Sequence, residues 1–202
     1  MTWTIKRNAW PPCYLQPPFA SGRYYPIAGY SVTTCYVFAG FIHGGQIWVP
    51  SRTSFDRLAC EISSAGAAGS LLRMAIYDSQ WDGVWPDKLV LDGNGALAAD
   101  SVGGKEHAIA VTLQPGIYWL VVTNTGDVSY RASIAGPVQR WRSADPSSLG
   151  QNYAGWGLEV SDRGLITPDD GWPARFFQPS DIYPNYYIAL QGTYPRLMLR
   201  AA

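Results

Sequence analysis

Apolar and polar positions alternate along two stretches of the chain, 54–63 (SFDRLACEIS) and 70–79 (SLLRMAIYDS). The apolar positions are Leu58, Cys60 and Ile62 in the first stretch and Leu72, Met74 and Ile76 in the second. Successive side chains of a β-strand point to opposite faces, so this period of two predicts two strands, each buried on one face. The Gly-rich segment 64–70 between them suits a hairpin connection, and we expect the two strands to pair.

A third stretch, 111–126 (VTLQPGIYWLVVTNTG), holds two apolar runs separated by Gln114, Pro115 and Gly116. Pro fixes φ at the first central position of a turn and Gly accepts a positive φ at the second, so Pro-Gly predicts a tight turn. The two runs are therefore either neighbouring strands or a strand that switches between sheets. The second run is almost continuously apolar, which indicates a strand covered on both faces. Its inward side chains are either Tyr118, Leu120 and Val122 or Ile117, Trp119 and Val121.

These strands and turns have the spacing of an all-β domain, and helical periodicity is almost absent. They predict one main domain, a jelly-roll-like antiparallel β-sandwich, in this chain of 202 residues. The residues expected in its single inter-sheet core are Leu58, Leu72, Ile76, Val111 and Leu120.

The chain has a different character on either side of this region. Residues 1–46 include a Pro-rich segment, and because Pro cannot donate to a sheet ladder we expect an extended N-terminal arm there. The sandwich domain is expected to span 47–202 and to close with a strand within 185–194. Within this domain, 137–185 is a Pro/Gly/aromatic insertion, and long loops of this type are usually functional.

Composition excludes several classes of function. Charged residues make up 15%, and the formal net charge is zero with very few lysines, so no basic surface for nucleic acid is expected. No apolar run is long enough for a signal peptide or a membrane span. Cys13, Cys35 and Cys60 lack C-x-x-C spacing, so we expect three free thiols in a protein made in a reducing cytoplasm, with Cys60 as a core residue.

Catalytic and metal-binding motifs are not found in the sequence. It has no nucleophile elbow, zinc-protease motif or phosphate-binding loop, and 92–98 (DGNGALA) is interpreted as a turn because no helix pattern follows it. His43 is expected in a Gly-rich turn and His107 at a strand start, both as surface or capping residues. The carboxylates Asp78, Asp82 and Asp87 lack the register of a calcium loop. We therefore expect no enzyme activity, no metal and no cofactor.

The aromatic excess, 14% of residues, is the remaining signal. Four tryptophans stand among Gly, Pro, Asp and Asn, a loop context in which a ring can stay accessible. A flat ring beside polar groups can bind the apolar face of a sugar. The candidate glycan-binding residues are Trp81, Asp82, Trp85, Asn152, Trp156, Asp170 and Trp172. The alternative, which we favour, is that these tryptophans fill the ends of the sandwich or are buried at contacts between subunits.

The N-terminal arm carries aromatic residues that would be exposed on an isolated domain. They are Trp3, Trp10, Tyr14 and Phe19, and the prolines around them favour an extended path. Large exposed apolar surface marks interaction sites, so we expect the arm to contact another subunit.

Several motifs occur in a characteristic order. Phe55-Asp56-Arg57 is followed by 73–78 (RMAIYD), then by Pro86, then by 113–120 (LQPGIYWL). In this order they resemble a β-sandwich module of tailed-bacteriophage and prophage particle proteins, found in tail fibres and other virion appendages. The resemblance covers roughly residues 47–126 and the final strand.

This resemblance implies a virion component, assembled in the host cytoplasm, that forms a homo-oligomer or docks to other virion subunits. The function it implies is a structural protein of the tail or a fibre that acts through protein–protein contacts. The alternative is a receptor-recognising, carbohydrate-binding module that attaches the particle to host surface glycans. A small glycan-active enzyme is a third possibility, but the sequence has no recognisable catalytic pair.

Overall fold

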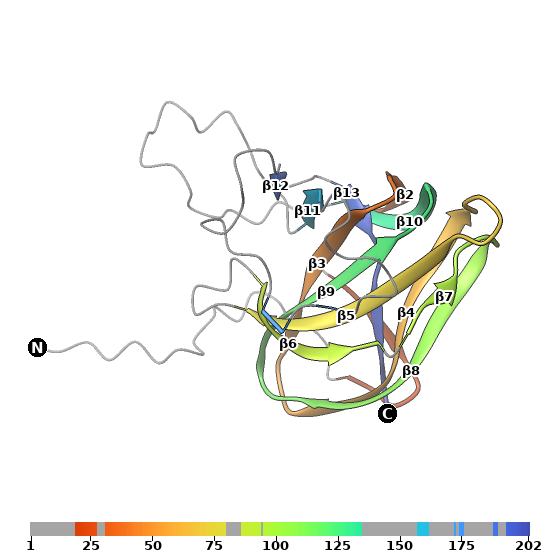
Figure 1. The fold of residues 1–202 in the computed structure, drawn as a ribbon. Helices are drawn as coiled ribbons and strands as arrows, with labels where there is room; N and C mark the ends of the chain where they lie inside the picture. Colours follow the sequence, from red (N-terminus) through yellow and green to blue (C-terminus); the bar gives the residue numbers. More distant parts are fainter. Residues whose placement is uncertain are drawn as a thin grey trace, which may run out of the picture.

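The computed structural model describes residues 19–27, 31–79, 86–93, 95–134, 157–161, 172, 174–175, 188–189 and 193–202. Every regular element in these ranges is a β-strand, and every strand pair is antiparallel. The strands form two sheets packed face to face (Figure 1). The predicted all-β antiparallel sandwich is therefore confirmed. Over the same ranges, no helix has the length and hydrophobicity needed to cross a bilayer.

The first sheet is organised around the long strand β4. β4 pairs with β8 along one edge, and along the other it pairs with β14 and then with β10. The strands of this sheet are β1 (Tyr24–Pro26), β2 (Ser31–Val37), β4 (Thr53–Ser64), β8 (Gly103–Leu113), β10 (Val128–Ile134), β13 (Thr193–Pro195) and β14 (Met198–Ala201).

The second sheet has β9 at its centre, between β3 and β5. Its strands are β3 (Phe41–Val49), β5 (Leu71–Ser79), β6 (Pro86–Asp92), β7 (Leu97–Ala98), β9 (Gly116–Asn124), β11 (Gly157–Ser161) and β12 (Ile188–Ala189). In chain order the strands therefore move repeatedly from one sheet to the other.

Two of these crossings bear on the sequence predictions. The expected pairing of the strands at 54–63 and 70–79 is wrong, because β4 belongs to the first sheet and β5 to the second. Alternation predicts which face of each strand is buried. Two strands with an apolar face can lie side by side in one sheet, or they can lie in different sheets and face each other across the core. Of the two alternatives for the runs around Pro115, the structure shows the switch between sheets, from β8 to β9.

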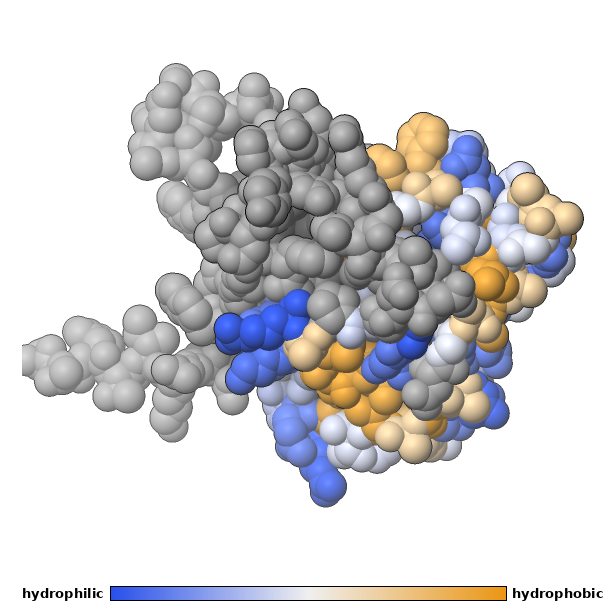
Figure 2. All heavy atoms as spheres, in the orientation of Figure 1, coloured by the Kyte–Doolittle hydropathy of each residue, from blue (hydrophilic) through white to orange (hydrophobic). Residues whose placement is uncertain are grey.

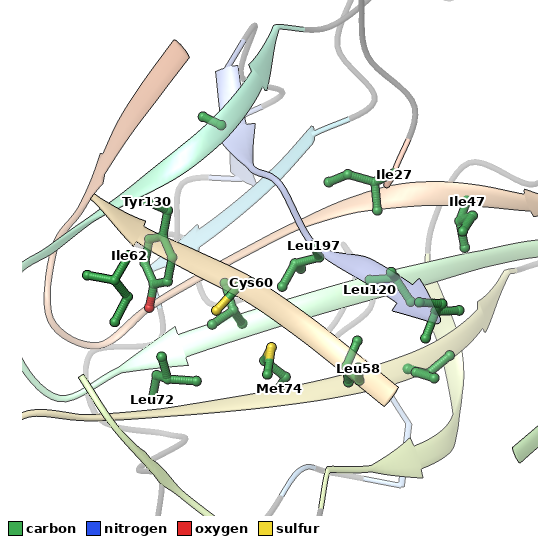
Figure 3. Packing of buried hydrophobic residues seen from close by; sticks show 14 of the residues in the cluster. Ile27, Ile47, Leu58, Cys60, Ile62, Leu72, Met74, Leu120, Tyr130 and Leu197 are labelled. Carbon is green, nitrogen blue, oxygen red and sulfur yellow. The ribbon is translucent and has the colours of Figure 1, made fainter. Parts of the chain in front are cut away.

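The core lies between the two sheets (Figure 3). Leu58, Leu72, Ile76 and Leu120 are fully buried in it, as predicted, whereas Val111 is half-buried at its margin. Cys60 is buried there as expected, and desolvation raises the pKa of its thiol to about 12, so it remains a neutral core side chain.

Both faces of β9 are covered, as its nearly continuous apolar sequence predicts. Leu120 and Val122 point into the inter-sheet core, while Trp119 and Val121 belong to a second buried cluster on the outer face of the second sheet. Leu120 and Val122 from one candidate set and Trp119 and Val121 from the other are therefore buried on opposite sides of the strand, whereas Tyr118 and Ile117 near its start are only partly buried.

The predicted boundary at residue 47 is wrong, because β1, β2 and most of β3 precede it. No proline occurs between Pro26 and Pro50, so the reason for expecting an extended arm ends well before residue 46. The closing segment 185–194 does contain β12 and the start of β13, but the strand that completes the first sheet is β14, which the sequence reading missed.

Asn124 connects the two sheets at one end of the sandwich. It is a buried residue at the end of β9, and its Nδ2 donates to the carbonyl of Gly126 at 2.6 Å and to those of Val37 and Phe38 at 3.4 Å. Its Oδ1 accepts a hydrogen bond from Tyr130 Oη at 3.3 Å. The Asn124 side-chain amide thus forms hydrogen bonds with residues at the end of β2, in β10 and in the turn after β9.

Replacing Asn124 with Leu is expected to lower the free energy of unfolding by about 1–3 kcal/mol, because buried polar partners would lose their hydrogen bonds. Urea unfolding followed by tryptophan fluorescence measures the change. Tyr130→Phe removes only the 3.3 Å bond and is the matched control, with a smaller loss expected. Equal stability of Asn124→Leu and the wild type would show that this amide does not hold the sheets together.

Candidate functional site

The outer face of the second sheet is buried rather than solvated, mainly by apolar and aromatic side chains, with the polar residues Gln46 and Thr123 buried among them. Tyr77 and Trp119 are directly opposed on β5 and β9, and both are buried. With them, the second cluster contains Ile42, Ala75, Val121 and Trp172. A two-layer sandwich normally exposes such a face, so its burial identifies a covered surface.

Trp172 is part of this cover. Its side chain is only 6% exposed and its ring lies edge-on to Tyr77, with 6.2 Å between ring centroids. Its backbone N–H approaches Asp92 Oδ2 at 3.5 Å, and Asp92 is held by two hydrogen bonds from Arg73, of 3.0 and 2.7 Å. Trp172 therefore has no free face for a sugar, so its candidate role as an accessible ring is wrong, and its burial agrees with the alternative that the loop tryptophans are packed against the sandwich. Its polar neighbours in sequence gave no sign of the aromatic sheet beneath it.

The four candidate tryptophans stand in two aromatic-rich segments, 79–87 and 151–175, and the ends of these segments meet where the structure describes them. Lys88 and Arg175 form an antiparallel bridge, and the N–H of Leu89 donates to the carbonyl of Ala174 at 2.9 Å. Arg175 Nε lies 3.3 Å from Asp87 Oδ1. The ends of both loops therefore lie side by side at the edge strand β6, which a shared binding surface requires.

The other candidate glycan-binding residues lie outside the described residues. They are Trp81, Asp82, Trp85, Asn152, Trp156 and Asp170. Of the carboxylates considered for calcium, Asp78 accepts a hydrogen bond from the backbone N–H of Lys88 at 2.6 Å and Asp87 is paired with Arg175. In the described ranges, no three His, Cys, Asp or Glu side chains come together as a metal site.

Both histidines are buried in strands, so their expected surface positions are wrong. His43 in β3 is 2% exposed and His107 in β8 is also buried. Burial lowers the pKa of His43 to about 4, and burial likewise lowers that of His107. The glycines after His43 suggested a turn, but a Cβ at Gly44 would lie 2.7 Å from the carbonyl of Leu120. Gly44 thus serves the close approach of β3 to β9.

A second surface lies on β2, the edge strand that pairs with β10 alone among the described strands. Val32, Tyr36 and Phe38, named here the β2 stripe, are 55%, 52% and 55% exposed. In Figure 2, hydrophobic residues reach the surface at the upper end of the molecule, where Figure 1 places β2 and β10. Alternation of side chains between residues 31 and 38 indicates this surface in the sequence. The prediction of an extended arm over residues 1–46 did not include this surface.

Ring contacts and hydrogen bonds hold the β2 stripe in place. Phe38 packs edge-on against Tyr36, at 5.0 Å between centroids, and contacts Phe41 at 5.8 Å. Tyr36 Oη donates to one carboxylate oxygen of Asp127 at 2.7 Å, and the N–H of Ala39 donates to the other at 2.9 Å. The exposed aromatic surface is therefore pre-organised.

The rest of the outer face of the first sheet differs from this stripe because its charges pair with one another. Arg200 donates two hydrogen bonds to Asp56, of 2.8 and 2.6 Å, and these hold the pKa of Asp56 below its usual value. Tyr24 Oη donates to Glu106 at 2.6 Å, and Arg57 lies 3.9 Å from the same carboxylate. The Phe55-Asp56-Arg57 motif thus contributes to sheet structure.

Of the four predicted assembly contacts, only Phe19 is among the described residues; Trp3, Trp10 and Tyr14 lie outside them. Phe19 packs edge-on against Tyr25 and Phe55, at 4.4 and 5.3 Å between ring centroids. Its ring is thus engaged in packing within the sandwich.

Comparison with known proteins finds no matching protein-family model and no matching curated protein. Among solved structures, one similar chain comes from the structure of infectious bursal disease virus, Gt strain, at 13% sequence identity and a TM-score of 0.31. The match covers 89% of this chain and 42% of that chain, so this chain spans less than half of its length. A TM-score at this level does not define a common fold.

Proposed function

We propose that this protein is a non-enzymatic structural subunit of a tailed-phage particle, in the tail or a fibre, that acts through protein–protein contacts. The β2 stripe is the observation that carries this proposal. Its three side chains are each more than half exposed, although they are large and apolar or aromatic. Contiguous apolar surface on a soluble protein marks an interaction site, and aromatic residues are enriched at protein interfaces.

Two further observations support a role in assembly. The motifs from Phe55 to Leu120 resemble those of phage virion modules, and Asp56 and Arg73 of these motifs stabilise the sheets through their ion pairs. In the described ranges, both histidines are buried within strands, so neither presents an imidazole at the surface. The partners are accordingly other virion subunits, and the location is the virion.

Purified particles are expected to contain this protein at a fixed, stoichiometric copy number, measured by quantitative mass spectrometry. A variant with Val32→Lys and Phe38→Lys is expected to lose incorporation by about tenfold or more, because a charge in a buried contact is strongly unfavourable. Val102→Lys is the control, because Val102 lies outside β2 and is 64% exposed. This variant is expected to incorporate into particles normally.

Deleting residues 1–18 tests the arm within the same experiment and leaves Phe19 on Phe55. The truncated chain is expected to fold but to incorporate poorly, since Trp3, Trp10 and Tyr14 are removed. Particles that lack the wild-type protein altogether would contradict the proposed function.

The second candidate is a carbohydrate-binding module for a host glycan. The observation in its favour is that the ends of loops 79–87 and 151–175 adjoin at Lys88 and Arg175. A receptor binder should give a glycan-array signal that Trp81→Ala with Trp156→Ala removes without a change in unfolding. A purely structural subunit should give no signal.

A further inference from the structure

β2 lacks the features that protect edge strands. Its seven residues pair in unbroken register with β10, so it has no bulge, and residues 31–38 include no charged residue and no proline. Edge strands of soluble proteins are normally blocked by charges, prolines or bulges, because an open ladder pairs with other chains. An unprotected edge beside an apolar stripe therefore indicates a surface that is covered by another strand.

The outward positions of β2 are self-complementary. When a strand pairs with a copy of itself in antiparallel orientation around Thr34, Val32 of one strand stands opposite Tyr36 of the other, and Thr34 stands opposite itself. Pairs of aromatic and β-branched side chains are among the favourable cross-strand pairs. Both members are already exposed, and Tyr36 is fixed by Asp127, so little side-chain ordering remains for association.

Electrostatics also favours a second copy. When a strand pairs with its own copy across a two-fold axis, a charged side chain near the axis lies close to the same charge on the copy, and the two repel. β2 contains no charged residue, so this repulsion does not arise within the strand. The charges on the neighbouring strands are opposite and paired, with Arg131 Nε 3.4 Å from Glu61 Oε1. A charged peptide, in contrast, finds no complementary charge along residues 31–38.

We infer that β2 pairs antiparallel with β2 of a second copy across a two-fold axis at Thr34, so that the first sheets of two copies form one continuous sheet. This inference rests on the proposed function, because it names the partner of β2, and the pairing places Val32 and Tyr36 of one copy beside Tyr36 and Val32 of the other. The resulting dimer is an isologous unit for assembly into a particle.

Cross-linking at the axis tests the register. Directly opposed residues in an antiparallel pair have Cα atoms about 4.5–5.5 Å apart, within the range that a disulfide spans. In a Cys13→Ser background, Thr34→Cys is expected to form a disulfide-linked dimer under mild oxidation at least about tenfold faster than the control Val102→Cys. Cys35 and Cys60 are both buried and remain in both variants.

The wild-type chain supplies a test that needs no variant. Sedimentation equilibrium should show a dimer, and Thr34→Lys should weaken it by about tenfold or more, since two like charges then meet at the axis. A wild-type monomer throughout, or a Val102→Cys cross-link as fast as that of Thr34→Cys, would overturn the inference. If the protein is stoichiometric in particles but shows no Thr34 cross-link, only the edge pairing is wrong. If the dimer forms but particles lack the protein, the proposed function is wrong.

Discussion

Leu120→Ala is expected to lower the free energy of unfolding by about 2–5 kcal/mol. Leu120 is fully buried on the inner face of β9, where its neighbours in register are Gly45 on β3 and Ile76 on β5. Gly45 has no side chain that could move into the space left by the truncation, so a cavity persists. The loss of stability should therefore exceed the transfer free energy of the removed carbon atoms.

Chemical unfolding followed by fluorescence and circular dichroism measures this loss. Val102→Ala is the control, because Val102 is one of the most exposed apolar residues described, and its effect should stay within about 0.5 kcal/mol. If Leu120→Ala also lowered the free energy of unfolding by less than about 0.5 kcal/mol, the assignment of Leu120 to the core would be wrong.

Acidification is expected to destabilise the protein through His43. Its pKa is about 4 in the folded chain, against an ordinary value of 6.5. Between these values the unfolded chain binds a proton that the folded chain does not, so stability is complete above pH 6.5 and falls as the pH drops towards 4. At about 1.4 kcal/mol per pH unit, the full loss from His43 is about 3 kcal/mol. His107 adds to it in the same direction.

The comparison of wild type with His43→Leu isolates this contribution, because carboxylates such as Asp56 titrate in both proteins. Unfolding free energies at pH 7, 6, 5 and 4 should fall more steeply for the wild type by about 3 kcal/mol over the whole range. Parallel pH profiles would mean that His43 is solvated and titrates normally in the folded chain.

Local pattern predicted which face of each strand is buried, but it did not predict the neighbours of the strands. Leu58 and Leu72 were assigned to the correct faces because strand geometry alone fixes alternation. Whether β4 and β5 pair or face each other depends on which strands become their neighbours in the sheet. The choice of neighbours is decided by contacts between residues far apart in the sequence. The segment 64–70 is compatible with both outcomes.

The candidate site shows the same limit. Trp172 and His43 were placed from their polar or glycine neighbours, yet each position is set by a distant strand: Tyr77 on β5 lies against Trp172, and β9 approaches Gly44 next to His43. The β2 stripe was predictable from its alternation. The prolines before it describe only the start of the segment 1–46, because none occurs between Pro26 and Pro50.

The place of β14 in the first sheet has a consequence for synthesis. β14 lies between β1 and β4, so Tyr24 pairs with Arg200 and Leu58 pairs with Leu199. Until residues 198–201 have emerged from the ribosome, β1 lacks its described partner and positions 55–59 along one edge of β4 stay unpaired, although both strands were made long before. Such distant pairings slow folding and leave nascent chains open to aggregation.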